Sequence, residues 1–62
     1  MYLFDLTNQE DLRIAASILE PLTEFEIRFQ FLTIQVQGDM YRDILCKALD
    51  ERKIQYAVDS LG

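Results

Sequence analysis

Apolar and polar residues alternate along residues 25–37, and this is the clearest pattern in the chain. The apolar positions are Phe25, Ile27, Phe29, Phe31, Leu32, Ile34 and Val36. A spacing of two is typical of a β-strand with one buried face, but the phase shifts by one residue at Phe31-Leu32. No Gly, Pro, Asn or Asp lies there, so a tight turn is not expected. We therefore predict one long strand with a bulge, since an extra residue exchanges its two faces.

Two other segments have the spacing of amphipathic helices. The first is predicted from Asn8 to residue 19 or 20, because Thr7 and Glu10 match a capping box and Pro21 disfavours helix before it. The second is predicted to follow Asp39, which has the side chain of a good N-cap. Residues 1–6 and 54–58 are short and apolar and are predicted to be strands.

This order of elements predicts a single domain over residues 1–62 with a small β-α-β-α-β fold. Both helices would pack on the sheet in a two-layer α/β (α+β) arrangement. The alternative is a compressed ferredoxin-like βαββαβ fold, in which the long strand splits at Phe31-Leu32 into a hairpin. The predicted core residues are Leu6, Leu12, Ala16, Leu19, Ile27, Phe29, Ile34, Ile44, Leu45, Leu49, Tyr56 and Val58.

The length of the predicted strand indicates a homodimer. Thirteen extended residues would span about 43 Å, whereas a compact chain of this size has a radius of gyration near 11 Å by the usual scaling. The overhang would expose an aromatic-rich edge, which a second copy could cover by antiparallel pairing. The predicted interface is Phe25, Ile27, Phe29, Phe31, Leu32, Ile34 and Val36. The alternative is that the strand bends and both halves serve one core.

The composition of the chain disfavours several kinds of function. The chain has 62 residues, no His, one Cys and a net charge of −5, which disfavours binding to nucleic acid or to an anionic membrane. Without His there is no usual general base, and Cys46 has no partner base that would make it a nucleophile. We expect no catalytic, cofactor or metal site. A single cysteine does not build a disulfide framework, so the expected location is the cytoplasm.

The function expected by elimination is a small acidic, non-enzymatic protein that acts through protein–protein contacts. It would inhibit or modulate a larger enzyme, such as a nucleic-acid-processing enzyme, in the manner of small phage-encoded modulators. Carboxylates facing a basic partner are expected among Glu20, Glu24, Glu26, Asp50, Glu51 and Asp59. The alternative function is a dimeric regulatory module that binds a small metabolite.

Overall fold

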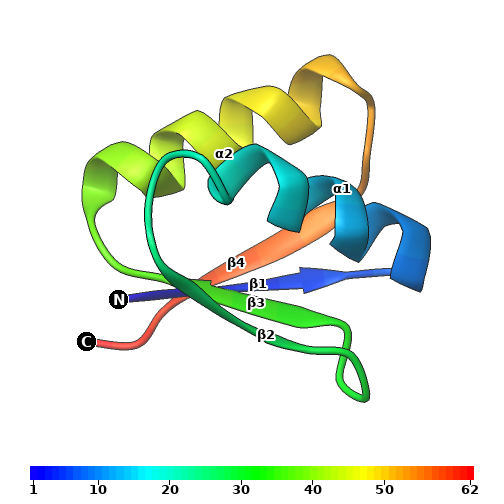
Figure 1. The fold of residues 1–62 in the computed structure, drawn as a ribbon, viewed down its shortest axis with the longest axis horizontal. Coiled ribbons are helices and arrows are strands. Elements are labelled where there is room, and N and C mark those ends of the chain that lie inside the picture. The colour runs from blue at the N-terminus through cyan, green and yellow to red at the C-terminus, as the bar shows by residue number, and fades with distance from the viewer.

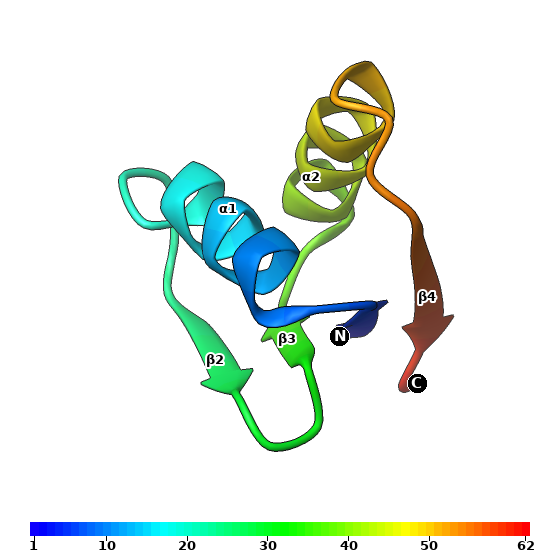
Figure 2. The same cartoon turned by 90° about the vertical axis from the view of Figure 1, so that its right-hand side faces the viewer.

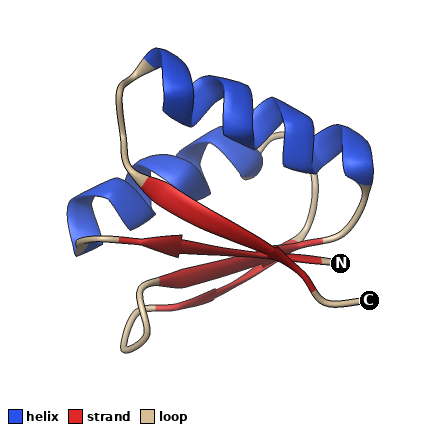
Figure 3. Cartoon of the chain, turned by 180° about the vertical axis from the view of Figure 1, so that it is seen from behind, coloured by secondary structure: helices blue, strands red, loops and turns tan.

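Four strands and two helices follow one another in the order β-α-β-β-α-β in the computed structural model, which describes all 62 residues. The elements are β1 (Tyr2–Leu6), α1 (Gln9–Leu19), β2 (Phe25–Arg28), β3 (Thr33–Val36), α2 (Asp39–Glu51) and β4 (Tyr56–Ser60). The strands form one antiparallel sheet in the order β2-β3-β1-β4. Both helices lie on the same face of this sheet (Figures 1 and 3), which gives the expected two-layer α+β arrangement.

The prediction of a single long strand over residues 25–37 is wrong. The segment forms β2 and β3, which are joined by the turn Phe29–Leu32 and paired in antiparallel register. Because Phe25 lies opposite Val36, the apolar residues of both strands face the helices. The shift of phase therefore marks a reversal of chain direction rather than a bulge, and the observed order of elements is the βαββαβ order of the alternative.

Both helices begin one residue away from the predicted caps. The first N-cap is Asn8 rather than Thr7, and its side chain accepts a hydrogen bond of 2.8 Å from the backbone N–H of Asp11. This bond satisfies one of the free N–H groups at the helix start. The second N-cap is Gly38, whose φ of +106° suits a residue without a Cβ, and Asp39 is already the first helical residue.

A polar contact fixes the start of α2 against β1. The hydroxyl of Tyr2 donates to the carboxylate of Asp39 and accepts a bond of 3.0 Å from the guanidinium of Arg42. The same guanidinium lies 4.7 Å from the centre of the Tyr2 ring and pairs with Asp43 at 2.8 Å. Asp39 therefore holds the hydroxyl of Tyr2 and does not cap the helix.

The core lies between the sheet and the helices. Its buried apolar side chains are Phe4, Leu6, Leu12, Ala15, Leu19, Ile34, Val36, Leu45 and Leu49. Among the predicted core residues, four are only partly buried: Ala16, Ile27, Ile44 and Tyr56. Phe29 and Val58 were predicted to be buried but are exposed. Phe29 lies in the turn, and Val58 lies on the edge strand β4, which the helices do not fully cover.

The other face of the sheet carries no helix, as Figure 2 shows with both helices above the strands. The residues on this open face alternate with the core residues along each strand. They are Leu3, Asp5, Glu26, Arg28, Thr33, Gln35, Ala57 and Asp59. Most of them are polar, as expected for the solvent-facing side of an antiparallel sheet.

Candidate functional site

The turn between β2 and β3, which we call the aromatic turn (Phe29–Leu32), projects two large apolar side chains into solvent. Phe31 is 62% exposed and Phe29 is 44% exposed. The guanidinium of Arg13 on α1 lies 5.8 Å from the centre of the Phe29 ring and holds this ring beside the helix. Phe31 borders a hollow on the open face that is lined mostly by polar residues, with Leu3 as the other apolar residue.

The backbone of the aromatic turn is strained at Leu32. Its φ is +56°, a left-handed conformation that costs a residue with a Cβ roughly 1–2 kcal/mol. Backbone bonds of 3.3 Å from Phe31 N–H to Arg28 C=O and from Leu32 N–H to Phe29 C=O close the turn. The N–H of Leu6 donates at 2.9 Å to the C=O of Leu32 and anchors the strained residue to β1. A Gly or Asn at this position would avoid the cost.

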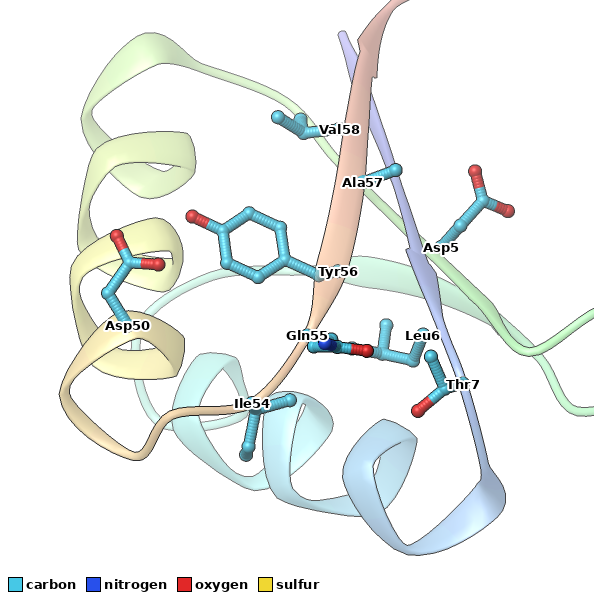
Figure 4. Close-up of a pocket in the computed structure, with 9 residues that line it drawn as sticks. All are labelled: Asp5, Leu6, Thr7, Asp50, Ile54, Gln55, Tyr56, Ala57 and Val58. Atoms are coloured by element: carbon cyan, nitrogen blue, oxygen red, sulfur yellow. The ribbon is translucent and has the colours of Figure 1, made fainter.

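A second surface feature, the edge groove, lies around the start of β4 and the end of the neighbouring strand β1 (Figure 4). It has a volume of about 780 Å³ and is lined by Asp5, Leu6, Thr7, Asp50, Ile54, Gln55, Tyr56, Ala57 and Val58. The side chains of Tyr56 and Val58 point toward α2, whereas Ala57 and Asp5 point to the open face. A carboxylate therefore lies on each side of the strand, Asp5 on one and Asp50 on the other, and no Lys or Arg lines the groove.

Tyr56 connects the groove to the core. Its ring lies 5.7 Å from that of Phe4, and its hydroxyl points toward α2. Burial raises the pKa of the Tyr56 hydroxyl well above its ordinary value, and the neighbouring Cys46 thiol and Asp50 carboxylate raise it further. The phenol therefore keeps its proton further into the alkaline range than an ordinary tyrosine does.

The raised pKa of Tyr56 predicts a loss of stability in alkali. The folded chain holds this proton more tightly than the unfolded chain, whose tyrosine pKa is about 10. The stabilisation is complete below that pH and is lost as the pH rises toward the folded pKa. Tyr2 acts in the same direction, since its hydrogen bond to Asp39 raises its pKa. We expect the free energy of unfolding to fall above about pH 10.

Urea unfolding between pH 8 and 11 measures this effect. Tyr56→Phe is expected to flatten the alkaline fall, and Tyr41→Phe serves as the control for loss of a phenol hydroxyl elsewhere. A Tyr56→Phe profile that stays parallel to that of the unaltered chain would contradict the link between Tyr56 and alkaline stability.

The predicted interface residues separate into three groups. Ile34 and Val36 are buried in the core of the chain itself, so they are not available for contact with a second copy. Phe25, Ile27 and Leu32 are partly buried against that core. Only Phe29 and Phe31 are largely exposed. Because β3 is paired with β1 and β2, antiparallel pairing of two copies through Ile34 has no free backbone to use.

The predicted acidic residues do not gather on one face. Glu20 and Glu24 lie at the end of α1 and in the following loop, and Glu26 forms an exposed ion pair of 2.9 Å with Arg28. Glu51 ends α2. Asp50 borders the edge groove, and Asp59 lies on β4 beside it. Asp5, which also lines the groove, was not among the predicted residues.

No group of three or more Cys, Asp or Glu side chains comes together in a manner that could hold a metal ion. Cys46 is free and partly buried. Neither helix is both long enough and apolar enough to cross a membrane. The aromatic turn and the edge groove are therefore the two surface features that could bind a partner or a ligand.

A scan against protein-family models, a search of curated proteins and a search of solved structures each found no match to the chain.

Proposed function

We propose that this protein is a non-enzymatic binding protein that docks onto a larger protein through the aromatic turn and modulates its activity. The observation that carries this proposal is the exposure of Phe29 and Phe31 on a turn whose backbone is strained at Leu32. Local strain clusters at functional sites, and positions that break local rules are expected there. A turn selected only for folding would carry Gly, Asn or Asp at these positions.

The chemistry of the turn fits an apolar pocket on a protein. Aromatic residues and Arg are enriched at the centres of protein interfaces, and Phe29 and Phe31 are flanked by Arg13 and Arg28. Arg28 is paired with Glu26, which leaves Arg13 as the one unpaired cation beside the turn. One cation on a chain with a net charge of −5 is much less positive charge than binding to phosphate backbones requires. The partner would receive the two rings in a pocket and surround them with polar contacts.

The test is affinity capture from the native cell, with variants of the turn. The unaltered chain is expected to capture one protein in stoichiometric amount, and Phe29→Ser with Phe31→Ser is expected to lose it. Met40→Ser is the matched control, because Met40 is 60% exposed on α2, away from the turn. Thermal melting of each variant verifies the fold. Equal capture by the turn variant and by Met40→Ser would refute the proposal.

The alternative function, a regulatory module that binds a metabolite between two copies, predicts a different result. A metabolite panel would then raise the melting temperature of the unaltered chain, and the size of the shift would depend on ligand concentration. The binding-protein proposal predicts no such shift. Sedimentation equilibrium at micromolar concentration measures the homodimer that the alternative requires.

A further inference from the structure

The strand β4 lies at the edge of the sheet opposite to the aromatic turn and has an unpaired outer side. The N–H of Leu61 donates at 2.8 Å to the C=O of Met1. This bond determines which β4 residues direct their backbone N–H and C=O groups toward β1. Because hydrogen-bonded pairs alternate in an antiparallel ladder, Ala57 and Asp59 bond to β1. The backbone N–H and C=O groups of Tyr56, Val58 and Ser60 therefore point outward.

Nothing in the chain covers this outer side. Residues 57–60 are all exposed, and no other segment lies beyond β4 in Figure 2. Proteins protect exposed edges with bulges, prolines, charged residues or a covering segment. β4 has no bulge and no proline, and its one charged residue, Asp59, lies on the open face. The opposite edge strand, β2, is shorter and carries the ion pair of Glu26 and Arg28.

The two sides of β4 differ in chemistry. On the side of the helices, the edge groove offers the apolar surfaces of Tyr56 and Val58. On the open face, Asp59 of β4 and Asp5 of β1 provide two carboxylates from neighbouring strands, and Asp5 lies opposite Ala57. A strand added beside β4 would therefore meet mainly apolar side chains on the face of the helices, where Asp50 adds one carboxylate, and two carboxylates on the open face.

We infer that β4 binds an extended segment of a partner protein as a fifth strand, and that this segment alternates apolar and basic residues. Its apolar side chains would lie against Val58 and Tyr56, and its Lys or Arg side chains would lie beside Asp5 and Asp59. Backbone hydrogen bonds to Tyr56, Val58 and Ser60 provide affinity, and the alternation provides specificity, as in other cases of strand addition. This site is separate from the aromatic turn and does not depend on it.

Charge argues against a second copy of this chain as the occupant. Pairing β4 with itself would bring the Asp5 and Asp59 carboxylates of both copies to one face of a continuous sheet. Each copy also carries a net charge of −5. Like charges brought together across an interface oppose association, whereas a basic segment neutralises these carboxylates.

The probe is a fluorescent, acetylated and amidated peptide with the alternating sequence Lys-Val-Lys-Val-Lys-Val-Lys, titrated with the full chain and followed by anisotropy. We expect saturable binding that weakens as salt rises. The same peptide with Glu in place of Lys is expected not to bind. A version with N-methyl valines, which lack the N–H donors, is expected to bind about tenfold more weakly or not at all.

Variants of β4 separate strand addition from attraction to the acidic surface alone. Val58→Pro removes an outward N–H without removing a bond to β1, and we expect it to weaken binding about tenfold. Val58→Thr keeps the donor and the branched shape and is the matched control. Asp5→Asn with Asp59→Asn is expected to weaken binding and to reduce its salt dependence. Phe31→Ser is expected to bind the peptide as the unaltered chain does, so failure of the proposed function would not affect this result.

Three results would overturn the inference. The first is equal binding of the Lys and Glu peptides, and the second is undiminished binding of the N-methylated peptide. The third is a micromolar dimer, measured by sedimentation equilibrium, that Val58→Pro dissociates, because the occupant of the edge would then be a second copy. The N-methylated peptide keeps the test decisive even if Val58→Pro does not fold.

Discussion

Replacing Ile34 by Pro is expected to abolish cooperative folding. Ile34 is fully buried on β3. The N–H of Leu6 donates to the C=O of Leu32, and hydrogen-bonded pairs recur every second residue in an antiparallel ladder. Phe4 and Ile34 are therefore the next hydrogen-bonded pair between β1 and β3. Proline at this position removes a ladder donor between two central strands and a buried side chain. Each of these losses is costly in a domain whose total stability is about 3–9 kcal/mol at the usual 0.05–0.15 kcal/mol per residue.

A comparison with Val58→Pro tests whether the effect of proline depends on the position of the strand in the sheet. Both changes introduce proline into a strand opposite Phe4, but the N–H of Val58 points to solvent. Val58→Pro is therefore expected to retain a cooperative thermal transition and the circular dichroism of the unaltered chain. Equal loss of structure in both variants would show that β4 is not the edge strand. Ile34→Val, which costs about 0.5–1.5 kcal/mol, controls for the side chain.

Replacing Leu45 by Ala is expected to lower the free energy of unfolding by about 2–5 kcal/mol. Leu45 lies on α2, is fully buried, and belongs to the core between the helices and the sheet. Removal of its side chain forfeits the burial of three carbon atoms and leaves a cavity that the neighbouring side chains fill only in part. A loss at the upper end of this range exceeds the lower end of the expected total stability, about 3 kcal/mol, and a chain of that stability would be mostly unfolded at room temperature after the substitution.

Urea unfolding of Leu45→Ala beside Met40→Ala measures this effect. Met40 lies on the same helix but is 60% exposed, so its replacement is expected to change the free energy by less than about 0.5 kcal/mol. Similar losses in the two variants would mean that α2 does not pack on the sheet through Leu45.

The helices and the terminal strands could be predicted from the sequence because their signals are local. The spacing of Leu12 and Leu19 on α1, and of Leu45 and Leu49 on α2, follows the helical period and identifies the buried face. The predicted starts of the helices were less accurate. Thr7 and Asn8 are both good N-cap residues, and only the backbone conformation distinguishes them.

The hairpin was predicted only as the alternative to one long strand, because its turn lacks the residues by which turns are recognised. Leu32 adopts a left-handed conformation that is rare for Leu, and the tertiary bond from Leu6 N–H helps to hold it there. That mistake determined the others. With one long strand in place of β2 and β3, Phe29 was assigned to the core, and Ile34 and Val36 were assigned to an interface between copies.

The edge groove also could not be predicted, because it depends on the order of strands. Asp5 and Asp50 come from β1 and α2, far apart in the sequence, and they border one groove only because β4 pairs with β1 at the edge of the sheet. Strand order is set by long-range pairing, which no local pattern reveals. The exposure of Val58 has the same origin, since its spacing of two residues from Tyr56 is equally consistent with a central strand.

The central claim is that the aromatic turn is the surface that meets a partner protein, and fluorine NMR tests it directly. The chain has four Phe residues, so labelling with fluorophenylalanine gives four signals. Phe4 is fully buried and Phe25 is partly buried, which makes them internal controls for Phe29 and Phe31. On addition of the captured partner, we predict that the signals of Phe29 and Phe31 shift or broaden while that of Phe4 stays in place. Binding of the partner with the signals of Phe29 and Phe31 unchanged would contradict the account.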